Sequence, residues 1–407
     1  MIKNRTAILA LLTGLNLLNY IDRAVVAAVL DPMQAELGLS SFAAGALNSV
    51  FLIGYFLTSP FFGARADKGA RKGLIALGVA IWSLATAASG LSTGLWTLVA
   101  ARVVVGVGEA SYATLAPTII DDLTPPEKKA RALSIFYMAI PVGYALGYIF
   151  GGMLGKAWGW RAAFYVTGVP GLLLAVTCLF IVEPPRKLVA AKGKLVDGLR
   201  EMIAIPQFRR SVIGYAIYTA GVGAFSFWAP KFLVARFPAQ LDLKSANFWF
   251  GTVLVVAGAA GTLIGGRWAD RASAGQPPKT GTNAMLRVCA WGMIIATPLS
   301  AMCFFAAVPW QFYAIAFAAQ LGLFLSTSPI SAVALRSVPE ERRASAMAAQ
   351  IFCIHLFGDL WSAAALGALM DVLPLTVAMM ALPVAFAGAA YVWWPRRREA
   401  AVVNPPA

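Results

Sequence analysis

Long apolar runs, separated by short polar stretches, recur along the whole of this chain of 407 residues. A helix needs about 20 apolar residues to cross the hydrocarbon core of a bilayer, and twelve segments reach that length. They are predicted at residues 7–30, 42–63, 73–92, 95–118, 131–154, 162–182, 211–235, 246–267, 284–306, 309–334, 344–368 and 374–394. Hydrophobic residues make up 59% of the chain and charged residues 13%, about half the charged share of a typical soluble domain. The sequence therefore predicts an all-α integral membrane protein.

Basic residues gather between alternate spans, which indicates how the chain is oriented. With the amino terminus placed in the cytoplasm, most of the Lys and Arg residues fall in cytoplasmic segments, and the opposite side keeps Lys156, Arg161, Lys231, Arg236 and Lys244. The positive-inside rule then predicts that both termini are cytoplasmic. The same short clusters account for the net charge of +15, so no nucleic-acid partner is expected.

The chain divides near its middle. We expect a six-helix bundle at residues 1–183, a cytoplasmic linker at 184–210, a second six-helix bundle at 211–394 and a cytoplasmic tail at 395–407. The linker opens with a Pro-Pro break and carries an amphipathic piece that could lie on the inner membrane surface. The alternative is a solvated tether between the bundles.

Two short motifs occur at matching places in both halves. The sequence Gly-Ala-Arg-Ala-Asp-Lys follows the second span at 63–68, and Gly-Arg-Trp-Ala-Asp-Arg follows the eighth at 266–271. Pro-Glu-Lys-Lys-Ala-Arg-Ala (126–132) and Glu-Glu-Arg-Arg-Ala-Ser-Ala (340–346) follow the fourth and tenth spans. Duplicated halves place a substrate site between them near the bilayer midplane. We interpret the loop motif as a conformational latch, because simple topogenic charge explains its Arg and Lys but not its repeated Gly and Asp. The latch residues are Gly63, Asp67, Arg71, Lys72, Gly266, Asp270 and Arg271.

These motifs resemble those of the major facilitator superfamily. The two loops are similar to its cytoplasmic signature, and Arg102 to Ala110 (RVVVGVGEA) is similar to its fourth-helix motif. Glycines of the fourth and fifth spans are expected to pack helices closely, and they are Gly106, Gly108, Gly143, Gly147, Gly151 and Gly152. The resemblance implies the major facilitator fold, with twelve helices in two six-helix bundles related by pseudo-two-fold symmetry. Tyr148 stands where proline commonly follows the fifth-helix glycine, so that helix alone does not argue for antiport.

A finer resemblance is to the spinster-like branch, whose eukaryotic members transport lysolipids and sphingolipids. It rests on Asn-Tyr-Ile-Asp-Arg at 19–23, on the Arg102 to Ala110 motif and on Phe-Trp-Ala-Pro-Lys-Phe-Leu at 227–233. The resemblance implies that Asp22 and Glu109 take part in proton coupling. The short connections between spans are typical of bacterial members, so we expect a bacterial inner membrane protein.

Four ionisable residues lie inside the first-half spans, where charge is expensive and indicates function. Arg102 and Glu109 are two helical turns apart and share a face, while Asp22 and Arg102 are expected at similar depth. We predict that Asp22 and Glu109 carry the coupling ion, H⁺, and that Arg102 modulates their affinity for it. Arg23 could pair with Glu109 or meet an anionic headgroup. The alternative is a fixed polar brace between helices.

His355 and Asp359 are four residues apart in the eleventh span and so share a face. His355 is the only histidine of the chain, and the titration range of histidine suits a proton relay. Packing and hydration of the helix are the alternative. We keep the pair as a possible relay.

The spans expected to line the cavity are rich in aromatic residues and poor in the amides that sugar carriers use. An amphipathic or lipid substrate therefore fits better than a sugar, with its tail on the aromatic lining and its head near the charges. The cavity residues predicted on this basis are Asn19, Tyr20, Tyr55, Tyr144, Tyr148, Phe225, Phe227 and Trp228. These aromatic residues could equally face lipid or pack between helices.

Other classes of function fit less well. One histidine and four cysteines without ligand spacing predict no metal site, no cofactor and no enzyme. A channel would show a repeated filter or a ring of like charges. The main rival is an exporter of drugs or small metabolites from the same superfamily. We expect a monomer whose partners are a small amphipathic solute and membrane lipids.

Overall fold

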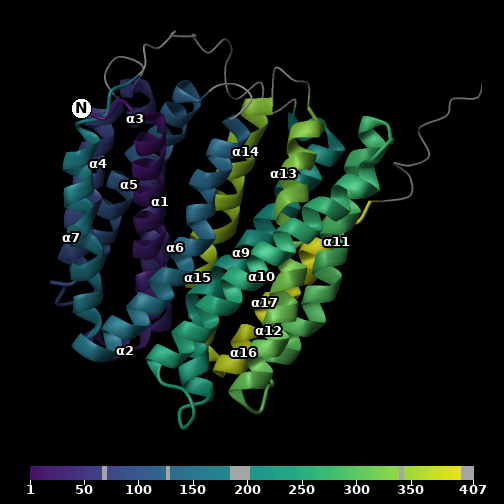
Figure 1. Cartoon of the computed structure of the whole chain (residues 1–407). Helices are drawn as coiled ribbons and strands as arrows, with labels where there is room; N and C mark the ends of the chain where they lie inside the picture. The colour runs from purple at the N-terminus through teal and green to yellow at the C-terminus, as the bar shows by residue number, and fades with distance from the viewer. Residues whose placement is uncertain (67–70, 125–128, 184–201, 339–342, 396–407) are drawn as a thin grey trace, which may run out of the picture. The chain divides into compact units, whose positions relative to one another are not determined.

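The computed structural model describes residues 1–66, 71–124, 129–183, 202–338 and 343–395, and this part of the chain is helical almost throughout (Figure 1). Within it, 12 helical segments are long and apolar enough to cross a membrane. They coincide with the runs expected from hydropathy, so the predicted all-α membrane fold is confirmed. Most of the predicted linker and the tail, at 184–201 and 396–407, lie outside the described residues.

The first six spans are single helices. They are α1 (Arg5–Ala28), α3 (Ser41–Ala66), α4 (Arg71–Ser89), α5 (Leu95–Leu123), α6 (Lys129–Trp158) and α7 (Trp160–Cys178). A short helix, α2 (Leu30–Leu37), follows α1 after a break at Val29 and ends at Gly38, whose φ of 61° lies in the left-handed region. The sequence prediction ran the first span through to residue 30 and did not separate α2.

The later spans are more interrupted. α9 (Pro206–Arg236), α10 (Leu243–Ser273) and α11 (Pro278–Cys303) are continuous, and α9 begins inside the segment predicted as linker. The tenth span consists of α12 (Pro309–Phe324) and α13 (Thr327–Arg336), and the twelfth of α16 (Leu375–Met379) and α17 (Ala381–Trp393). The eleventh joins α14 (Arg343–Ile354) to α15 (Leu360–Val372) through a π-helical turn, η3 (His355–Asp359). Hydropathy alone does not reveal these breaks, because the apolar character continues across them.

Local capping fixes the start of α1. The Asn4 side chain accepts hydrogen bonds from the amides of Thr6 and Ala7 at 2.8 and 3.3 Å, which satisfies two amides that have no partner within the helix. Ile2, ahead of the cap, forms a parallel bridge with Ile181 beyond α7. The amino-terminal end of α1 and the end of α7 therefore lie together.

The chain forms two compact units. Unit 1 comprises Met1–Ala190 and Phe227–Thr252, and unit 2 comprises Ala191–Ser226 and Val253–Ala407. The boundary falls within α9 and within α10. The ends of these two helices that flank their connecting loop therefore belong to the same compact unit as α1 to α7.

In unit 1, α1 packs against α6, while α3 and α4 both pack against α5, and α4 also packs against α7 (Figure 1). Their shared core is apolar and holds the fully buried Trp82 and Tyr112. The Tyr112 hydroxyl donates to the Leu12 carbonyl, which ties α5 to α1. In unit 2, α11 packs against α12, α13 and α17.

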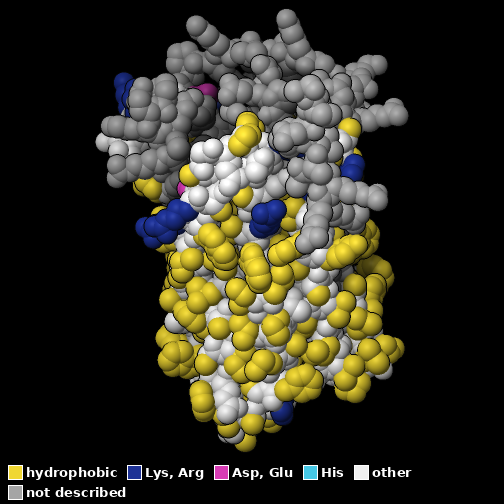
Figure 2. All heavy atoms as spheres, turned by 90° about the vertical axis from the view of Figure 1, so that its right-hand side faces the viewer, with side chains coloured by type: hydrophobic (Ala, Val, Ile, Leu, Met, Phe, Trp, Pro, Cys, Tyr) yellow, Lys and Arg dark blue, Asp and Glu magenta, His cyan; other side chains and the backbone are white. Residues whose placement is uncertain are grey.

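Large apolar side chains also cover the outside of the helices. Leu57, Leu173 and Val384 are more than 70% exposed, and Figure 2 shows hydrophobic side chains over most of one face, with Lys and Arg near its upper border. Soluble monomers rarely expose apolar surface on this scale. Lipid contact accounts for this exposed apolar surface, because an apolar side chain that faces hydrocarbon carries no free-energy penalty.

Candidate functional site

Four charged residues of unit 1 meet between α1 and α5. Asp22 and Arg23 lie on α1, and Arg102 and Glu109 lie on α5. The side chains of Asp22, Arg102 and Glu109 are buried, and that of Arg23 is 13% exposed. The seven-residue spacing predicted a shared face for Arg102 and Glu109, and the structure brings all four residues into electrostatic range of one another.

Arg23 forms the central ion pair with Glu109. Its Nε and Nη2 atoms donate to the same carboxylate oxygen, Oε2, at 2.9 and 2.5 Å. The other oxygen, Oε1, has no hydrogen-bond partner among the described residues. Of the two partners that the sequence left open for Arg23, the structure shows Glu109. A charge-assisted pair of this kind is strong in a dry site, and removing one member leaves the other uncompensated.

The ring of Phe51, on α3, lies between the two arginines. The guanidinium of Arg23 is 4.9 Å from the ring centroid and that of Arg102 is 5.2 Å from it. Such contacts stabilise a buried cation through the negative face of the ring. Arg102 makes no hydrogen bond through Nε or Nη1 to any described residue, so these two donors are available to an acceptor.

Asp22 is held separately from Arg23. The Thr86 hydroxyl, on α4, donates to its Oδ2 atom at 3.4 Å, while Oδ1 has no partner among the described residues. Adjacent residues on a helix point about 100° apart, which explains why Asp22 and Arg23 contact different helices. The cluster thus contains one tight ion pair and one buried carboxylate that interacts with the hydroxyls of Thr86 and Thr167.

Three of the predicted cavity tyrosines surround Arg23, namely Tyr20, Tyr55 and Tyr144. Arg23 stacks over the Tyr20 ring at 4.9 Å, and the rings of Tyr20 and Tyr144 are 5.3 Å apart. Asn19 lies one turn before Arg23 on α1, and its buried amide nitrogen has no described partner. These residues form an aromatic and polar rim around the ion pair.

The other predicted cavity residues lie in packed helix contacts. Tyr148 meets Phe250 with ring centroids 5.1 Å apart, Phe225 meets Phe304 at 6.2 Å and Phe227 meets Trp228 at 5.3 Å. Trp228 is fully buried. The aromatic neighbours given for these side chains do not include Arg23.

The predicted packing glycines lie at close helix approaches. A methyl group at Gly106 would overlap the Phe51 carbonyl of α3, and one at Gly108 would overlap Gly78 of α4. On α6, methyl groups at Gly143, Gly147 and Gly151 would lie 2.6–2.8 Å from α1 atoms, and one at Gly152 would lie 2.8 Å from Asn247 of α10. The glycines of α5 therefore allow its close approach to α3 and α4.

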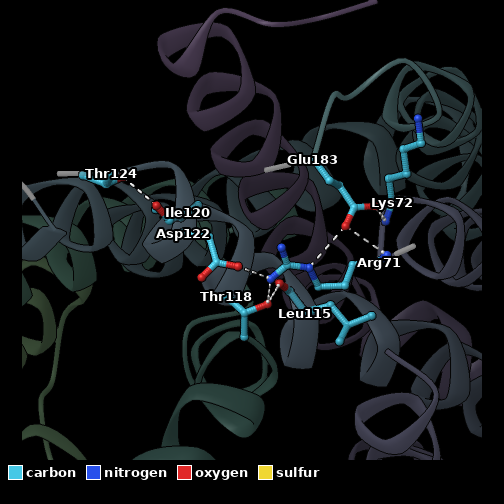
Figure 3. A network of polar contacts seen from close by, with 8 residues as sticks. All are labelled: Arg71, Lys72, Leu115, Thr118, Ile120, Asp122, Thr124 and Glu183. Atoms are coloured by element: carbon cyan, nitrogen blue, oxygen red, sulfur yellow. Dashed lines mark hydrogen bonds and ion pairs between the residues drawn. The ribbon is translucent and has the colours of Figure 1, made fainter. Parts of the chain in front are cut away.

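A second polar network surrounds Arg71, at the end of unit 1 where the chain's amino terminus lies (Figure 3). Arg71 begins α4 and is only 2% exposed. Its Nη1 atom lies 2.7 Å from Asp122 and 2.9 Å from the Thr118 hydroxyl, and its Nε atom lies 3.3 Å from Glu183. Glu183 also accepts from the backbone amides of Arg71 at 3.2 Å and Lys72 at 2.7 Å. It therefore caps α4 while it pairs with Arg71.

Several latch residues have different partners from those expected. Asp67, predicted to cap a helix or to pair with Arg71 or Lys72, lies outside the described residues. Of Gly63 only the helical backbone, at the end of α3, is described. The Lys72 side chain points away from the network in Figure 3. Sequence reasoning missed Thr118, Asp122 and Glu183. A signal existed for Glu183, since an acidic residue directly before a Pro-Pro break marks the end of a span at the membrane surface.

The second copy of the loop motif is exposed. Asp270 lies 3.9 Å from Arg336, and their side chains are 76% and 51% exposed. Arg271 is also exposed, and Gly266 lies near Ser328 of α13. The N-cap residue of α11 is Pro277, which makes no side-chain capping hydrogen bond.

The His355–Asp359 pair lies in the π-helical turn η3 of unit 2. The Nδ1 atom of His355 is 3.0 Å from both carboxylate oxygens of Asp359. The Thr219 hydroxyl, on α9, donates to the Ile354 carbonyl at 3.2 Å, and a methyl group at Gly358 would overlap that hydroxyl. π-helical turns often occur at functional sites, and this one fixes the pair against α9.

Comparisons with known proteins agree with this architecture. The family model described as Major Facilitator Superfamily matches residues 12–360. Probable sphingolipid transporter spinster homolog 2 of Arabidopsis thaliana is 32% identical over 397 residues, covering 88% of this chain and 79% of that protein. Protein spinster homolog 1 of Homo sapiens is 34% identical over 391 residues, covering 89% and 72%.

Solved structures show the same fold. A bacterial homolog of the human lysosomal transporter Spinster, in an inward-facing and unoccupied conformation, superposes with a TM-score of 0.84 at 24% identity and covers 97% of each chain. A D-xylose–proton symporter superposes with a TM-score of 0.75 at 18% identity and covers 96% of this chain and 97% of its own.

The fold and its membrane spans define a multi-pass secondary transporter. The chain belongs to the Major Facilitator Superfamily, in its spinster-like branch. Its relatives are transporters rather than enzymes, as the sequence indicated.

Proposed function

We propose that the protein is a proton-coupled transporter of an amphipathic, lipid-like solute of the lysolipid or sphingolipid type, and that it works by alternating access. One observation carries the proposal. The buried Arg23–Glu109 pair lies beside Asp22 and Arg102, inside an aromatic rim. It combines groups that bind protons with groups that bind anions.

Protonation of Glu109 is the step that links proton and solute. The ionised carboxylate holds Arg23 through two hydrogen bonds. A proton on Glu109 removes the charge that balances Arg23, while the guanidinium stays cationic. Arg23 then pairs with an anionic headgroup in place of Glu109. Asp22 is the second proton carrier, and Arg102 modulates its affinity for the proton.

The headgroup in this scheme carries a phosphate or another anionic oxygen group. A guanidinium binds such groups through two parallel hydrogen bonds, and Arg102 has two donors without a described partner. The aromatic rim of Tyr20, Tyr55 and Tyr144 suits an apolar chain next to the headgroup. The Arabidopsis thaliana relative is named as a probable sphingolipid transporter, which supports a lipid-like solute here.

The orientation follows from the distribution of basic residues. Both termini face the cytoplasm of a bacterial cell in this proposal, with the chain in the inner membrane as a monomer. The end of unit 1 that carries Arg71 is then cytoplasmic, and the end that carries α2 is the outer end. The latch residues around Arg71 hold the cytoplasmic end, and His355–Asp359 serves as a relay in the second half.

Uptake into proteoliposomes tests the coupling. Purified protein is reconstituted, a pH gradient is imposed and the entry of a fluorescent lysolipid is followed. Asp22→Asn and Glu109→Gln are expected to lose at least about tenfold of the gradient-driven rate, a typical loss for a proton-transfer group. Asp31→Asn is the matched control, since Asp31 lies on α2. Full gradient-driven uptake by both site variants would reject proton coupling.

A solute panel tests the substrate class. Lysolipids are compared with hydrophilic drugs and metabolites for saturable flux at carrier-like rates. We expect lysolipids to saturate and to compete with one another. Saturable flux of the hydrophilic solutes alone would replace the lipid assignment with an exporter of drugs or small metabolites.

His355→Ala is expected to shift the pH profile of uptake if the relay operates.

A further inference from the structure

A proline leaves one backbone carbonyl of α1 without a helical partner. The carbonyl of Ala28 would normally accept from the amide four residues later, but that residue is Pro32, which has no N–H. The amide of the following residue, Met33, donates to the Val29 carbonyl at 3.2 Å. Ala28 is fully buried, so its carbonyl needs a donor from elsewhere.

Asn247, on α10, supplies that donor. Its Nδ2 atom lies 3.1 Å from the Ala28 oxygen and also donates to the Leu243 carbonyl of its own helix at 2.8 Å. The side chain is fully buried. It reaches α1 because Gly152, on α6, has no side chain there, and a methyl group on Gly152 would lie 2.8 Å from the Cβ atom of Asn247.

Other contacts at the same end of unit 1 are weaker candidates for holding it closed. Lys156 pairs with Asp242, but both side chains are more than a third exposed, and exposed ion pairs contribute little. Lys231 donates to Gln34 on α2 at 2.5 Å. Asn247 is the contact whose loss leaves a fully buried carbonyl unpaired, and such loss is more costly than an exposed ion pair.

We infer that Asn247 is a positioning residue of the transport cycle, and that its bond to Ala28 holds the outer end of the transporter closed. When that end opens, water replaces Asn247 at the Ala28 carbonyl. The bond therefore stabilises the closed form selectively, and it acts on the same helix that carries Asp22 and Arg23. This inference rests on the alternating-access cycle of the proposed function.

Thiol labelling of a single introduced cysteine measures the opening. Ala145, on α6, is 6% exposed and lies against Gly251 of α10. The full-length Ala145→Cys protein is placed in nanodiscs and treated with a polar maleimide, and the labelling of its four buried natural cysteines is subtracted using the parent protein. Asn247→Ala is expected to raise the labelling rate of Cys at position 145 about tenfold, which corresponds to about 1.4 kcal/mol.

Asn247→Leu keeps the size of the side chain and removes the donor, so it is expected to raise the rate similarly if Asn247→Ala does not fold. Thr252→Ala is the matched control on α10, because the Thr252 hydroxyl donates to Phe248 of its own helix. Lys156→Ala is expected to change the rate less than about threefold. Unchanged labelling in both Asn247 variants would overturn the inference.

Pro32→Ala separates the hydrogen bond from simple packing. It restores an amide that can donate to the Ala28 carbonyl, so Asn247→Ala in this background is expected to raise labelling less than about threefold. An equal rise in both backgrounds would overturn the inference. The assay needs neither the transported solute nor a pH gradient, so it fails or succeeds independently of the uptake experiments.

Discussion

The two copies of the repeated loop motif share sequence but differ in how their charges are held. In the first copy, Arg71 is buried and contacts Asp122 and Glu183, and Glu183 also caps α4. In the second half, Asp270 of the motif and Arg336 of α13 are largely exposed and lie 3.9 Å apart, and Pro277, the N-cap residue of α11, makes no side-chain capping hydrogen bond. Burial of the cation, rather than the motif sequence, decides how much each copy contributes to the stability of the fold. The difference depends on Glu183, which lies in the segment that follows α7 and outside both motifs.

The largest expected effect comes from deleting the buried cation. Arg71→Ala leaves Asp122 and Glu183 facing each other without a counter-charge, and we expect the unfolding free energy to fall by about 2–4 kcal/mol. Arg336→Ala removes the exposed partner of Asp270 in the second half and is the comparison variant, which is expected to change the unfolding free energy by less than about 0.5 kcal/mol. Denaturant unfolding in detergent, followed by helical circular dichroism, measures both. Equal losses would contradict the comparison.

Removing the cap tests the part played by Glu183. Glu183→Ala leaves the first amides of α4 unpaired and removes a negative charge from the helix start, so we expect a loss of about 1–2 kcal/mol. Glu183→Gln keeps an acceptor and is expected to lose less. The same unfolding assay distinguishes them. If the two variants were equally destabilised, the ion pair with Arg71 and not the cap would explain the stability of this end.

Adding a side-chain cap to α11, the helix that follows the second copy, should narrow the difference in stability between the two copies. Pro277 occupies the N-cap of α11 with φ −55° and ψ 150°, a backbone shape that suits a capping serine. Pro277→Ser is expected to stabilise the protein by about 0.5 kcal/mol, less than a full cap because the proline constraint on the unfolded chain is lost. Pro278→Ser, one residue later, is the control. Destabilisation by Pro277→Ser would show that α11 gains nothing from a cap.

The smallest effect concerns an exposed ion pair and its pH dependence. Hydrogen bonds from Lys156 and Ser245 hold the pKa of the Asp242 carboxyl well below its usual range. Because the folded pKa is lowered, the stabilisation is present above the ordinary carboxyl pKa of about 4 and is lost as the pH falls through the lower folded value. Asp242→Asn should therefore give a small, constant loss between pH 7 and 5 that shrinks below pH 4. A loss that grows on acidification would reverse the assigned sign.

Hydropathy predicted the membrane spans because lipid demands long apolar helices whatever their neighbours are. The shared face of Arg102 and Glu109 was also predictable, since helical spacing alone determines it. Phe51 was not, because an apolar residue in a span gives no sign that two guanidinium groups will stack on it. The partners of Arg71 were missed for a similar reason, since they come from the end of α5 and from the segment that follows α7. The break between α12 and α13 and the π-helical turn at His355 leave hydropathy unchanged.

The bond between Asn247 and Ala28 has a consequence for how such sequences diverge. Pro32 leaves the Ala28 carbonyl without a helical donor, and Asn247 donates a hydrogen bond to it, although Pro32 and Asn247 lie far apart in the chain. A substitution at position 32 that restores a backbone amide removes the need for a donor at position 247. Relatives without the proline should therefore tolerate apolar residues at the second position, and the two sites should change together during evolution.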